Sequence, residues 1–233
     1  MQVRIDSYGN GVGHKIYRNY FHGAKGRNAN ALEIGTNGNH RTVQTDVVAE
    51  YNLIADWTGG RCLSTKVGGT TLRFNTCLNA GSEDAVNRLG TRNKWIANWI
   101  EGSTGDALRI IDQGNEVIGN RIIGSAHLRL HTGNCTPPES GLSGCASPAY
   151  PAATDTLLAG NDGEVRVGDG YNCCNVPARN TRIEAHEGEI KYGNHGNTDV
   201  SDSTSRTIPD AVKLSPPDVG PFAPTAPRLA PIA

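Results

Sequence analysis

Apolar residues along this chain fall in short runs in which they alternate with polar residues over four or five positions. Several such runs stand directly before an asparagine: His14-Lys-Ile-Tyr-Arg, Thr70-Thr-Leu-Arg-Phe, Lys94-Trp-Ile-Ala and Glu116-Val-Ile-Gly. A helix would require apolar residues at three- and four-residue spacing over more than ten positions. The pattern therefore predicts short β-strands that are separated by turns.

The asparagines that follow these runs recur at a nearly constant spacing. Asn19, Asn52, Asn75, Asn98 and Asn120 are separated by 33, 23, 23 and 22 residues. A period near 22 residues is typical of one coil of a parallel β-helix, in which equivalent side chains of successive coils stack. Because Asn tolerates the left-handed conformation and its amide can bond to the next Asn, we expect the last four in equivalent turns. A leucine-rich repeat is excluded, since it would need several leucines per repeat.

A second repeat lies further along the chain. Residues 155–168 match residues 180–193 at an offset of 25 positions. We therefore predict an all-β parallel β-helix, a solenoid with coils of about 22–25 residues, over residues 1–205. Residues 132–152, which carry Cys, Pro, Ser and Gly, are predicted to form a long insertion. Residues 206–233 are rich in Pro and are predicted to form an extended C-terminal tail.

Composition agrees with a chain of many turns. The 233 residues (24.7 kDa) include 29 Gly and 12 Pro, and only 36% are hydrophobic, which argues against a helical bundle. The 22 Lys and Arg residues balance 23 Asp and Glu, so no overall field recruits nucleic acid or an anionic membrane. No apolar run is long enough to cross a bilayer. The first residues lack the features of a secretory signal, so we expect any export signal to be missing from this chain.

Cysteines and histidines can both bind metals. The six cysteines are too few and too scattered for a disulfide scaffold, and we expect them mainly as small buried residues. Cys135 and Cys145 flank the insertion and would close a loop in an oxidising compartment. His127 and His131 share one face of a predicted strand without an evident third ligand, so we expect a satisfied pair rather than a zinc site.

Basic residues show the spacing of the coils. Lys66 and Arg88 are 22 residues apart, and Arg109 follows 21 residues later, so we expect the three to lie nearly above one another on one face. Arg61 belongs to the first of these coils, and the sequence leaves open which face of the helix its side chain is on. Charged residues at outward positions of a β-helix usually form a solvent-exposed face without a specific function. A row of cations along a groove also suits an extended polyanion, whose carboxylates would meet one charge after another.

Several motifs resemble polysaccharide lyase family 6, the chondroitinase B and alginate lyase group. The resemblance covers residues 14–130 and rests on the order and spacing of six elements: Asn19-Tyr-Phe, Leu32-Glu-Ile-Gly35, Leu63-Ser-Thr-Lys66, Arg88-Leu-Gly90, Ala107-Leu-Arg-Ile-Ile111 and Asn120-Arg-Ile-Ile. It implies a right-handed parallel β-helix that cleaves 4-linked uronic-acid polymers by β-elimination. Members of the family carry further N-terminal coils, so the resemblance also implies a shortened member whose first coil starts near His14.

The resemblance further implies roles for individual residues. Lys66 would be the catalytic base that removes the C5 proton, Arg88 would serve the departing O4, and Arg109 would bind substrate. The acidic residues that hold the family's calcium stand five and seven positions before the lysine, where this chain has Arg61 and Gly59. This departure implies that the calcium site is lost and that no cofactor is needed. A guanidinium at Arg61 would then contact the substrate carboxylate. The histidine that follows the family's arginine is replaced by Leu89.

We therefore expect a secreted or periplasmic polysaccharide lyase with an anionic polysaccharide, alginate before other uronans, as its partner. Two other functions stay open. One is a non-catalytic carbohydrate-binding or structural β-helix. The other is a uronate C5-epimerase, which removes the same proton but returns it to C5. The sequence does not determine the oligomeric state.

Overall fold

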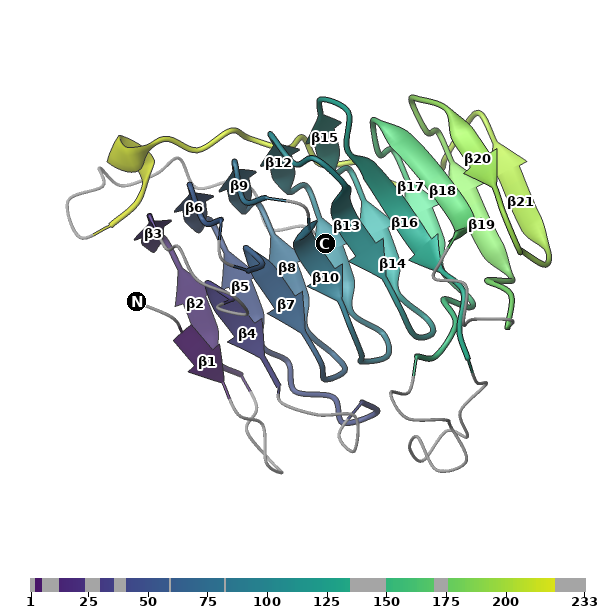
Figure 1. The fold of residues 1–233 in the computed structure, drawn as a ribbon, viewed down its shortest axis with the longest axis horizontal. Helices are drawn as coiled ribbons and strands as arrows, with labels where there is room; N and C mark the ends of the chain where they lie inside the picture. The colour runs from purple at the N-terminus through teal and green to yellow at the C-terminus, as the bar shows by residue number, and fades with distance from the viewer. Residues whose placement is uncertain are drawn as a thin grey trace.

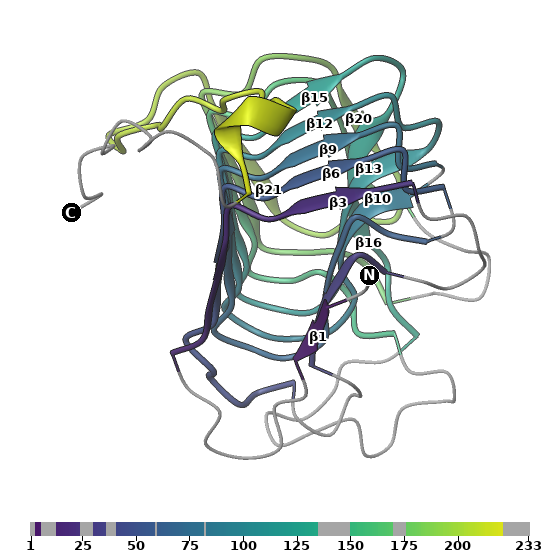
Figure 2. The same cartoon turned by 90° about the vertical axis from the view of Figure 1, so that its left-hand side faces the viewer.

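The computed structural model describes residues 3–5, 13–23, 30–35, 41–58, 60–81, 83–134, 150–169 and 176–220. These residues form a right-handed parallel β-helix whose wall consists of three parallel sheets. Each coil passes through the sheets in turn, and successive coils stack along the long axis (Figure 1). Seen along that axis, the three sheets enclose a common interior (Figure 2). The predicted fold class is confirmed.

All strands are short, and each sheet takes one strand from successive coils. Sheet A contains β1 (Val3–Ile5), β4 (Leu32–Ile34), β7 (Leu63–Thr65), β10 (Glu83–Asn87), β13 (Asp106–Ile110), β16 (His127–His131), β18 (Glu164–Asp169) and β20 (Ile190–Tyr192). Sheet B contains β2 (Lys15–Tyr17), β5 (Val48–Glu50), β8 (Thr71–Arg73), β11 (Lys94–Ile96), β14 (Glu116–Ile118), β17 (Leu157–Ala159), β19 (Thr181–Glu184) and β21 (Thr198–Ser201). Sheet C contains β3 (Tyr20–His22), β6 (Leu53–Ala55), β9 (Thr76–Leu78), β12 (Trp99–Glu101) and β15 (Arg121–Ile123).

The register of the sheets reproduces the sequence periods. In sheet A, Leu63 pairs with Ala85, 22 residues later, and Ala85 pairs with Leu108 after a further 23. The later repeat has the longer period, because Val165 pairs with Ile190 at an offset of 25. The inward-facing members of these columns are apolar, and they form one core along the helix in which Leu63, Ala85, Leu108 and Val165 are buried and Ile190 is partly buried.

The corner between sheets B and C contains the asparagine ladder. Asn52, Asn75 and Asn98 each donate a hydrogen bond from Nδ2 to Oδ1 of the ladder asparagine in the next coil, over 2.9–3.0 Å. The ladder begins at Asn19 and continues from Asn120 to Asn161. The predicted equivalence of the asparagines is therefore confirmed, and their amide groups are satisfied inside the wall.

One detail of that prediction is wrong. The left-handed conformation falls on the residue before each ladder asparagine, as at Tyr51, Phe74 and Ala97, whose φ angles lie between 51° and 55°. The asparagine itself enters the next strand, and its backbone N–H bonds to the side chain of the neighbouring coil, as from Asn52 to Asn75. The ladder thus supplies hydrogen bonds to the corner, while the preceding residue makes the bend.

Two cysteines differ from the expected small buried residues. Cys62 and Cys77 are buried in the core but form a disulfide, which joins the start of β7 to β9 across the interior. Cys135, Cys145 and the other two cysteines lie outside the described residues. Most of the predicted insertion at 132–152 lies there as well.

The first part of the predicted tail, residues 206–220, runs back along the helix at the corner between sheets B and C (Figures 1 and 2). Leu214 packs against Leu53, and its backbone N–H donates to Thr76 Oγ1 over 2.9 Å. A 3₁₀ turn, η2 (Pro216–Asp218), follows, and the Gly220 N–H reaches the carbonyl of Arg18 in the first coil. This segment therefore links coils from both halves of the helix. No helix among the described residues has the length and apolar character needed to cross a bilayer.

Candidate active site

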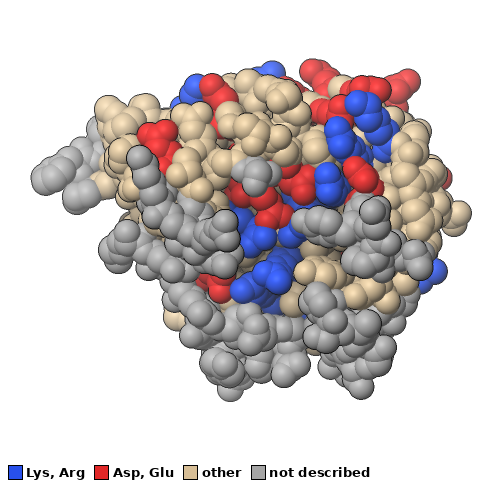
Figure 3. Space-filling view, viewed as in Figure 1, with Lys and Arg blue, Asp and Glu red and all other residues tan. Residues whose placement is uncertain are grey.

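The outer face of sheet A carries two parallel columns of charged side chains. Strand register aligns four cations, which we call the cation column: Arg109, Arg129, Arg166 and Lys191. An acid column lies beside it and contains Glu83, Asp106 and Glu164, with His127 between the last two. Figure 3 shows Lys and Arg side chains beside Asp and Glu side chains on this face. The columns exist because outward positions of parallel strands stack at about 4.8 Å per coil.

The two columns neutralise one another through ion pairs. Arg109 lies 2.7 Å from Glu83, Arg129 lies 3.0 Å from Asp106, and Lys191 lies 2.6 Å from Glu164. Hydrogen bonds from Lys191 and Arg166 lower the pKa of Glu164. The face is therefore strongly polar but nearly balanced in charge.

Lys66 and Arg88 lie at equivalent positions on neighbouring coils, directly after β7 and β10. The pairing of Thr65 with Asn87 sets this register, and the Arg88 N–H donates to the Thr65 carbonyl over 3.0 Å. Lys66 Nζ lies 3.1 Å from Glu33 Oε1, and Asn30 donates to the other oxygen of the same carboxylate. The nearest charged group to the lysine is thus a carboxylate rather than one of the expected cations. Arg88 forms no ion pair with any residue that the structure describes.

The prediction that Arg109 continues the line of Lys66 and Arg88 is wrong by two residues. Arg109 pairs with Val86, whereas the register places Ile111 opposite Arg88. The reason is that β10 and β13 are offset by 23 residues, not by the 21 that separate the two arginines in sequence. Arg109 therefore belongs to the adjacent column on the same face.

Arg61 and Arg109 nevertheless meet, at Glu83. Arg61 Nη2 contacts Glu83 Oε2, and Arg109 Nη2 lies 2.7 Å from Glu83 Oε1. The two guanidinium groups share one carboxylate, so the group of three carries a net positive charge. The structure thus brings Arg61 to the same face as Lys66, Arg88 and Arg109, which the sequence left open.

The described donors of this site do not fit a calcium ion. Calcium requires several oxygen ligands, usually with carboxylates among them. The two carboxylates of the site, Glu33 and Glu83, are each engaged by cationic side chains. Two other carboxylates that might supply a metal site are also paired, Glu50 with Arg73 and Asp56 with His22. Within the described ranges, no group of three His, Cys, Asp or Glu residues lies close enough to hold a metal. Gly59 lies outside these ranges.

The histidines of β16 differ in their environments. Burial would raise the pKa of Asp106, but the hydrogen bond from His127, at 2.8 Å, and the charges of Arg129, His127 and Arg109 lower it. Burial lowers the pKa of His131 to about 4, although its bond to the Thr132 carbonyl opposes the shift. His131 is therefore a neutral ring at neutral pH. His127 is thus held by Asp106, and His131 bonds to the Thr132 carbonyl.

Arg129, Arg166 and Lys191 were not predicted on this face. The sequence does contain a pattern that indicates two of these cations. Glu164-Val-Arg and Glu189-Ile-Lys lie at the same place in the 25-residue repeat, with acid and cation two residues apart on one face of a strand. The predicted insertion at residues 132–152 lies between Arg129 and Arg166 in the sequence, so a constant spacing counted along the chain does not reveal the columns.

Comparisons with known proteins support the fold. No protein-family model and no curated protein matches the sequence. Among solved structures, one match is a mannuronic acid specific polysaccharide family 6 lyase enzyme from human gut microbiota, with a TM-score of 0.66 and 20% identity. It covers 82% of this chain and 46% of the matched chain. Another is a PL6 family polysaccharide lyase from Pseudopedobacter saltans, with a TM-score of 0.56 and 17% identity, covering 89% and 63%.

These likenesses identify the class: the chain has the right-handed parallel β-helix fold of polysaccharide lyase family 6. The resemblance inferred from the sequence motifs is thereby confirmed for the fold. This chain spans about half to two thirds of the length of the two lyases.

Proposed function

We propose that this chain is a polysaccharide lyase that cleaves a 4-linked uronic-acid polymer, alginate above all, by β-elimination. The observation that carries the proposal is the placement of Lys66 and Arg88 at equivalent positions of adjacent coils, beside the cationic group at Glu83. The shared fold with two lyases of family 6 agrees with it. A polyuronate is an extended chain, and the outer face of sheet A is a long surface with cations at regular intervals.

The proposed reaction requires three functions of the protein. Lys66 Nζ, once its ammonium proton has passed to Glu33 or to water, accepts the C5 proton as general base, and the electron pair left behind forms the C4–C5 double bond as the C4–O4 bond breaks. Arg88 stabilises the negative charge that develops on O4, and water supplies the proton that O4 gains. Arg61 and Arg109 neutralise the C6 carboxylate, which makes the C5 proton more acidic. Glu33 holds Nζ in place before the substrate arrives.

The proposal excludes a calcium requirement and places the protein outside the cytoplasm. The guanidinium pair at Glu83 would neutralise the substrate carboxylate in place of the family's calcium ion. Two guanidinium groups and one carboxylate leave one positive charge for the substrate. The disulfide between Cys62 and Cys77 supports secretion or a periplasmic location, since disulfides persist in oxidising compartments.

The test is incubation of the purified chain with polymannuronate, polyguluronate, dermatan and glucuronan while the absorbance of the unsaturated product is followed. We expect Lys66→Ala and Arg88→Ala each to lower turnover by roughly a hundredfold or more. The matched control is Lys94→Ala, which removes an exposed lysine from sheet B and should leave turnover unchanged. Arg88→Ala and Lys94→Ala should each change the free energy of unfolding by no more than about 0.5 kcal/mol. Lys66→Ala should lower it by more than that, because it removes the cation from the buried Glu33 carboxylate.

A calcium chelator should leave turnover intact in the same assay, whereas Arg61→Ala should lower it. Loss of activity on chelation, restored by added calcium, would contradict the metal-free mechanism. Binding of a uronan without any product would instead indicate a carbohydrate-binding module. Incorporation of solvent deuterium at C5 without an unsaturated product would indicate an epimerase.

A further inference from the structure

The turn that carries Arg88 packs closely against the coil that carries Lys66. Two residues after Arg88, Gly90 has a φ angle of 109°, in the left-handed region where side chains are strained. A Cβ atom at Gly90 would lie 2.2 Å from the Val67 carbonyl oxygen. Because the turn has no spare room on that side, a shift of Gly90 moves Arg88 relative to Lys66.

Side chains hold both polar backbone groups of Gly90. Its carbonyl accepts hydrogen bonds from Nδ2 of Asn87 and of Asn93, at 3.1 and 3.2 Å. Its N–H donates to Asp112 Oδ2 over 3.0 Å. The two asparagines belong to the same coil as Gly90, whereas Asp112 belongs to the next one. Of the three side chains that bind Gly90 itself, Asp112 is thus the one from the next coil, and Asn87 also reaches that coil through its bond to the Ile111 carbonyl over 2.7 Å.

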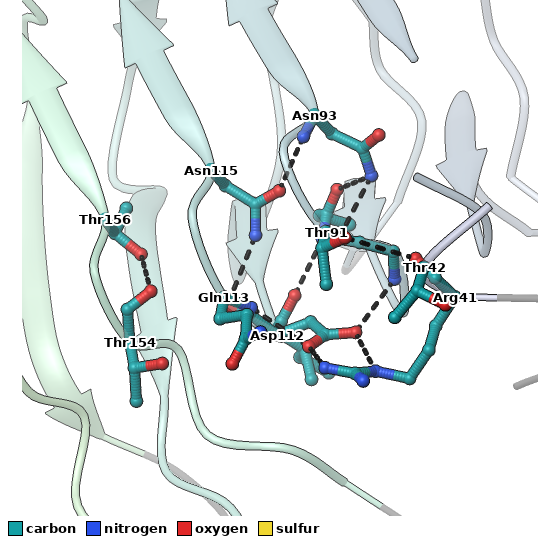
Figure 4. A network of polar contacts seen from close by, with 12 residues as sticks. Arg41, Thr42, Thr91, Asn93, Asp112, Gln113, Asn115, Thr154 and Thr156 are labelled. Carbon is teal, nitrogen blue, oxygen red and sulfur yellow. Dashed lines mark hydrogen bonds and ion pairs between the residues drawn. The ribbon is translucent and has the colours of Figure 1, made fainter. Parts of the chain in front are cut away.

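Asp112 is itself held by an arginine from a distant part of the chain (Figure 4). Arg41 Nε donates to Asp112 Oδ2 over 2.8 Å, and its Nη2 donates to Oδ1, which also accepts the Gln113 N–H. Both side chains of the ion pair are completely buried. A buried ion pair of this kind is weak evidence for stability, because desolvation offsets the attraction between the charges. Its place beside Gly90 suggests a different use.

The local sequence explains how Arg41 reaches this place. The connection between β4 and β5 spans residues 35–47, whereas the equivalent connection one coil later spans only residues 66–70. The extra length carries Arg41 past the neighbouring coils, and its carbonyl accepts the Thr91 N–H over 2.9 Å. Arg41 is thus anchored to the residue after Gly90 by its backbone, and to the carboxylate that holds Gly90 by its side chain.

We propose that Arg41 and Asp112 are positioning residues for Arg88: the buried ion pair fixes the Asp112 carboxylate, which holds the Gly90 N–H and with it the turn from which Arg88 acts. The catalytic part of this inference rests on the proposed lyase function. Neither residue touches the substrate. Their effect on the reaction passes through Arg88, because a misplacement of about 1 Å can cost a hundredfold in rate.

The test compares two double variants that remove the ion pair equally. Arg41→Met/Asp112→Gly removes the acceptor of the Gly90 N–H, and glycine suits the φ angle of 81° at position 112. Arg41→Met/Asp112→Asn keeps an amide oxygen at the same place, and Asn tolerates this conformation. If the ion pair contributed to stability alone, both variants would show the same kcat and the same hydrogen exchange. Each is measured by steady-state kinetics on the preferred uronan and by hydrogen exchange of the peptide that spans residues 86–91.

We expect the glycine variant to lose about tenfold or more in kcat with KM changed by less than about twofold. Its 86–91 peptide should exchange faster than in the wild-type protein. The asparagine variant should keep most of the wild-type kcat and most of the wild-type protection of this peptide from hydrogen exchange. In an Arg88→Ala background, the glycine variant should lower kcat no further, because Asp112 acts through Arg88.

Equal kcat and equal exchange in the two variants would overturn the proposal. If the glycine variant does not fold, Arg41→Lys, which keeps the charge but loses the two-point contact, must show slower turnover and faster exchange at 86–91. A wild-type chain that releases no product from any uronan would refute the proposed function, and the exchange comparison would still decide whether Asp112 holds the turn.

Discussion

At the scale of single residues, one carboxylate organises the cationic part of the candidate site. Glu83 receives Arg61 on one oxygen and Arg109 on the other, so two positive charges are held close together with a net charge of one. Lys66 is held by Glu33 in the same way. Arg88 has no such partner among the described residues, so its guanidinium is available for the role that we propose for it. In the proposed function, charged pairs of this kind are complementary to a ligand that carries its own carboxylates.

A second carboxylate nearby has no such cation in the part of the chain that the structure describes. Asp84 lies completely buried in β10, next to Glu83 in sequence, and burial raises its pKa to about 8 against a smaller lowering effect of Ser103. The folded protein therefore keeps Asp84 protonated at pH values where the unfolded chain ionises it. Since the unfolded state then binds fewer protons, this residue makes the free energy of unfolding fall as pH rises from about 4 to about 8.

We therefore predict that Asp84→Asn changes the pH dependence of stability. Relative to the wild-type protein, the variant should gain on the order of 2–5 kcal/mol in the free energy of unfolding between pH 4 and pH 8, because its amide does not ionise. Urea unfolding of both proteins at pH 4, 6 and 8 measures the difference, in which all other titrating groups cancel. Parallel curves would show that Asp84 ionises normally in the folded state.

At the scale of elements, the strands are too short to be stable alone and depend on the coils on either side. Most contain only three residues, as in β8 (Thr71–Arg73) and β11 (Lys94–Ile96). The corners keep these strands in register because each coil repeats the same bend. A left-handed residue precedes an asparagine whose side chain bonds to the next coil. The ladder is thus a chain of buried amide groups that satisfy one another, and such groups are costly to leave unpaired.

The stability that is lost when a ladder asparagine is replaced should depend on its position in the ladder. Asn98 donates to the Leu72 carbonyl and to Asn120, and it accepts from the Asn75 side chain and backbone. Asn98→Ala leaves several buried groups unpaired, and we expect it to lower the free energy of unfolding by about 3 kcal/mol. Asn19→Ala, at the half-exposed start of the ladder, should cost about 1 kcal/mol or less. Chemical denaturation tests this, and equal losses would contradict a cooperative ladder.

At the scale of the whole molecule, two features join parts that the coil-by-coil stacking does not. The disulfide between Cys62 and Cys77 ties sheet A to sheet C through the interior, immediately after Arg61. Residues 206–220 return along the helix and bring Leu214 against Leu53 and Gly220 to Arg18. In a solenoid each coil contacts mainly its neighbours. The returning segment therefore makes distant coils respond together, whereas the disulfide links two sheets within a single coil.

The disulfide should contribute substantially to stability. It closes a loop with a sequence separation of 15 residues, and closure of such a loop is worth about 3 kcal/mol in the unfolded-state entropy model. We predict that Cys62→Ala/Cys77→Ala lowers the free energy of unfolding by about that amount. A reducing agent should lower the stability of the wild-type protein more than that of the double variant. If both respond equally to the reducing agent, the bond does not carry the stability assigned to it.

The sequence by itself determined the features that repeat. Its asparagine spacing and the match at an offset of 25 residues predicted the β-helix, the coil length and the equivalence of the ladder asparagines, because stacking turns a constant period into columns. The same logic correctly placed Lys66 and Arg88 at equivalent positions. It failed by two residues at Arg109, where the coil length changes from 22 to 23 and spacing counted along the chain no longer equals register.

Only the tertiary structure decided what lies between columns and across distant coils. The sharing of Glu83 by two arginines depends on side chains from three coils. The contact between Arg41 and Asp112 joins residues 71 positions apart through an irregular connection that has no counterpart in the repeat. The disulfide likewise depends on two side chains that point into the same interior. Such contacts are set by how the coils pack in three dimensions, and a one-dimensional period carries no information about them.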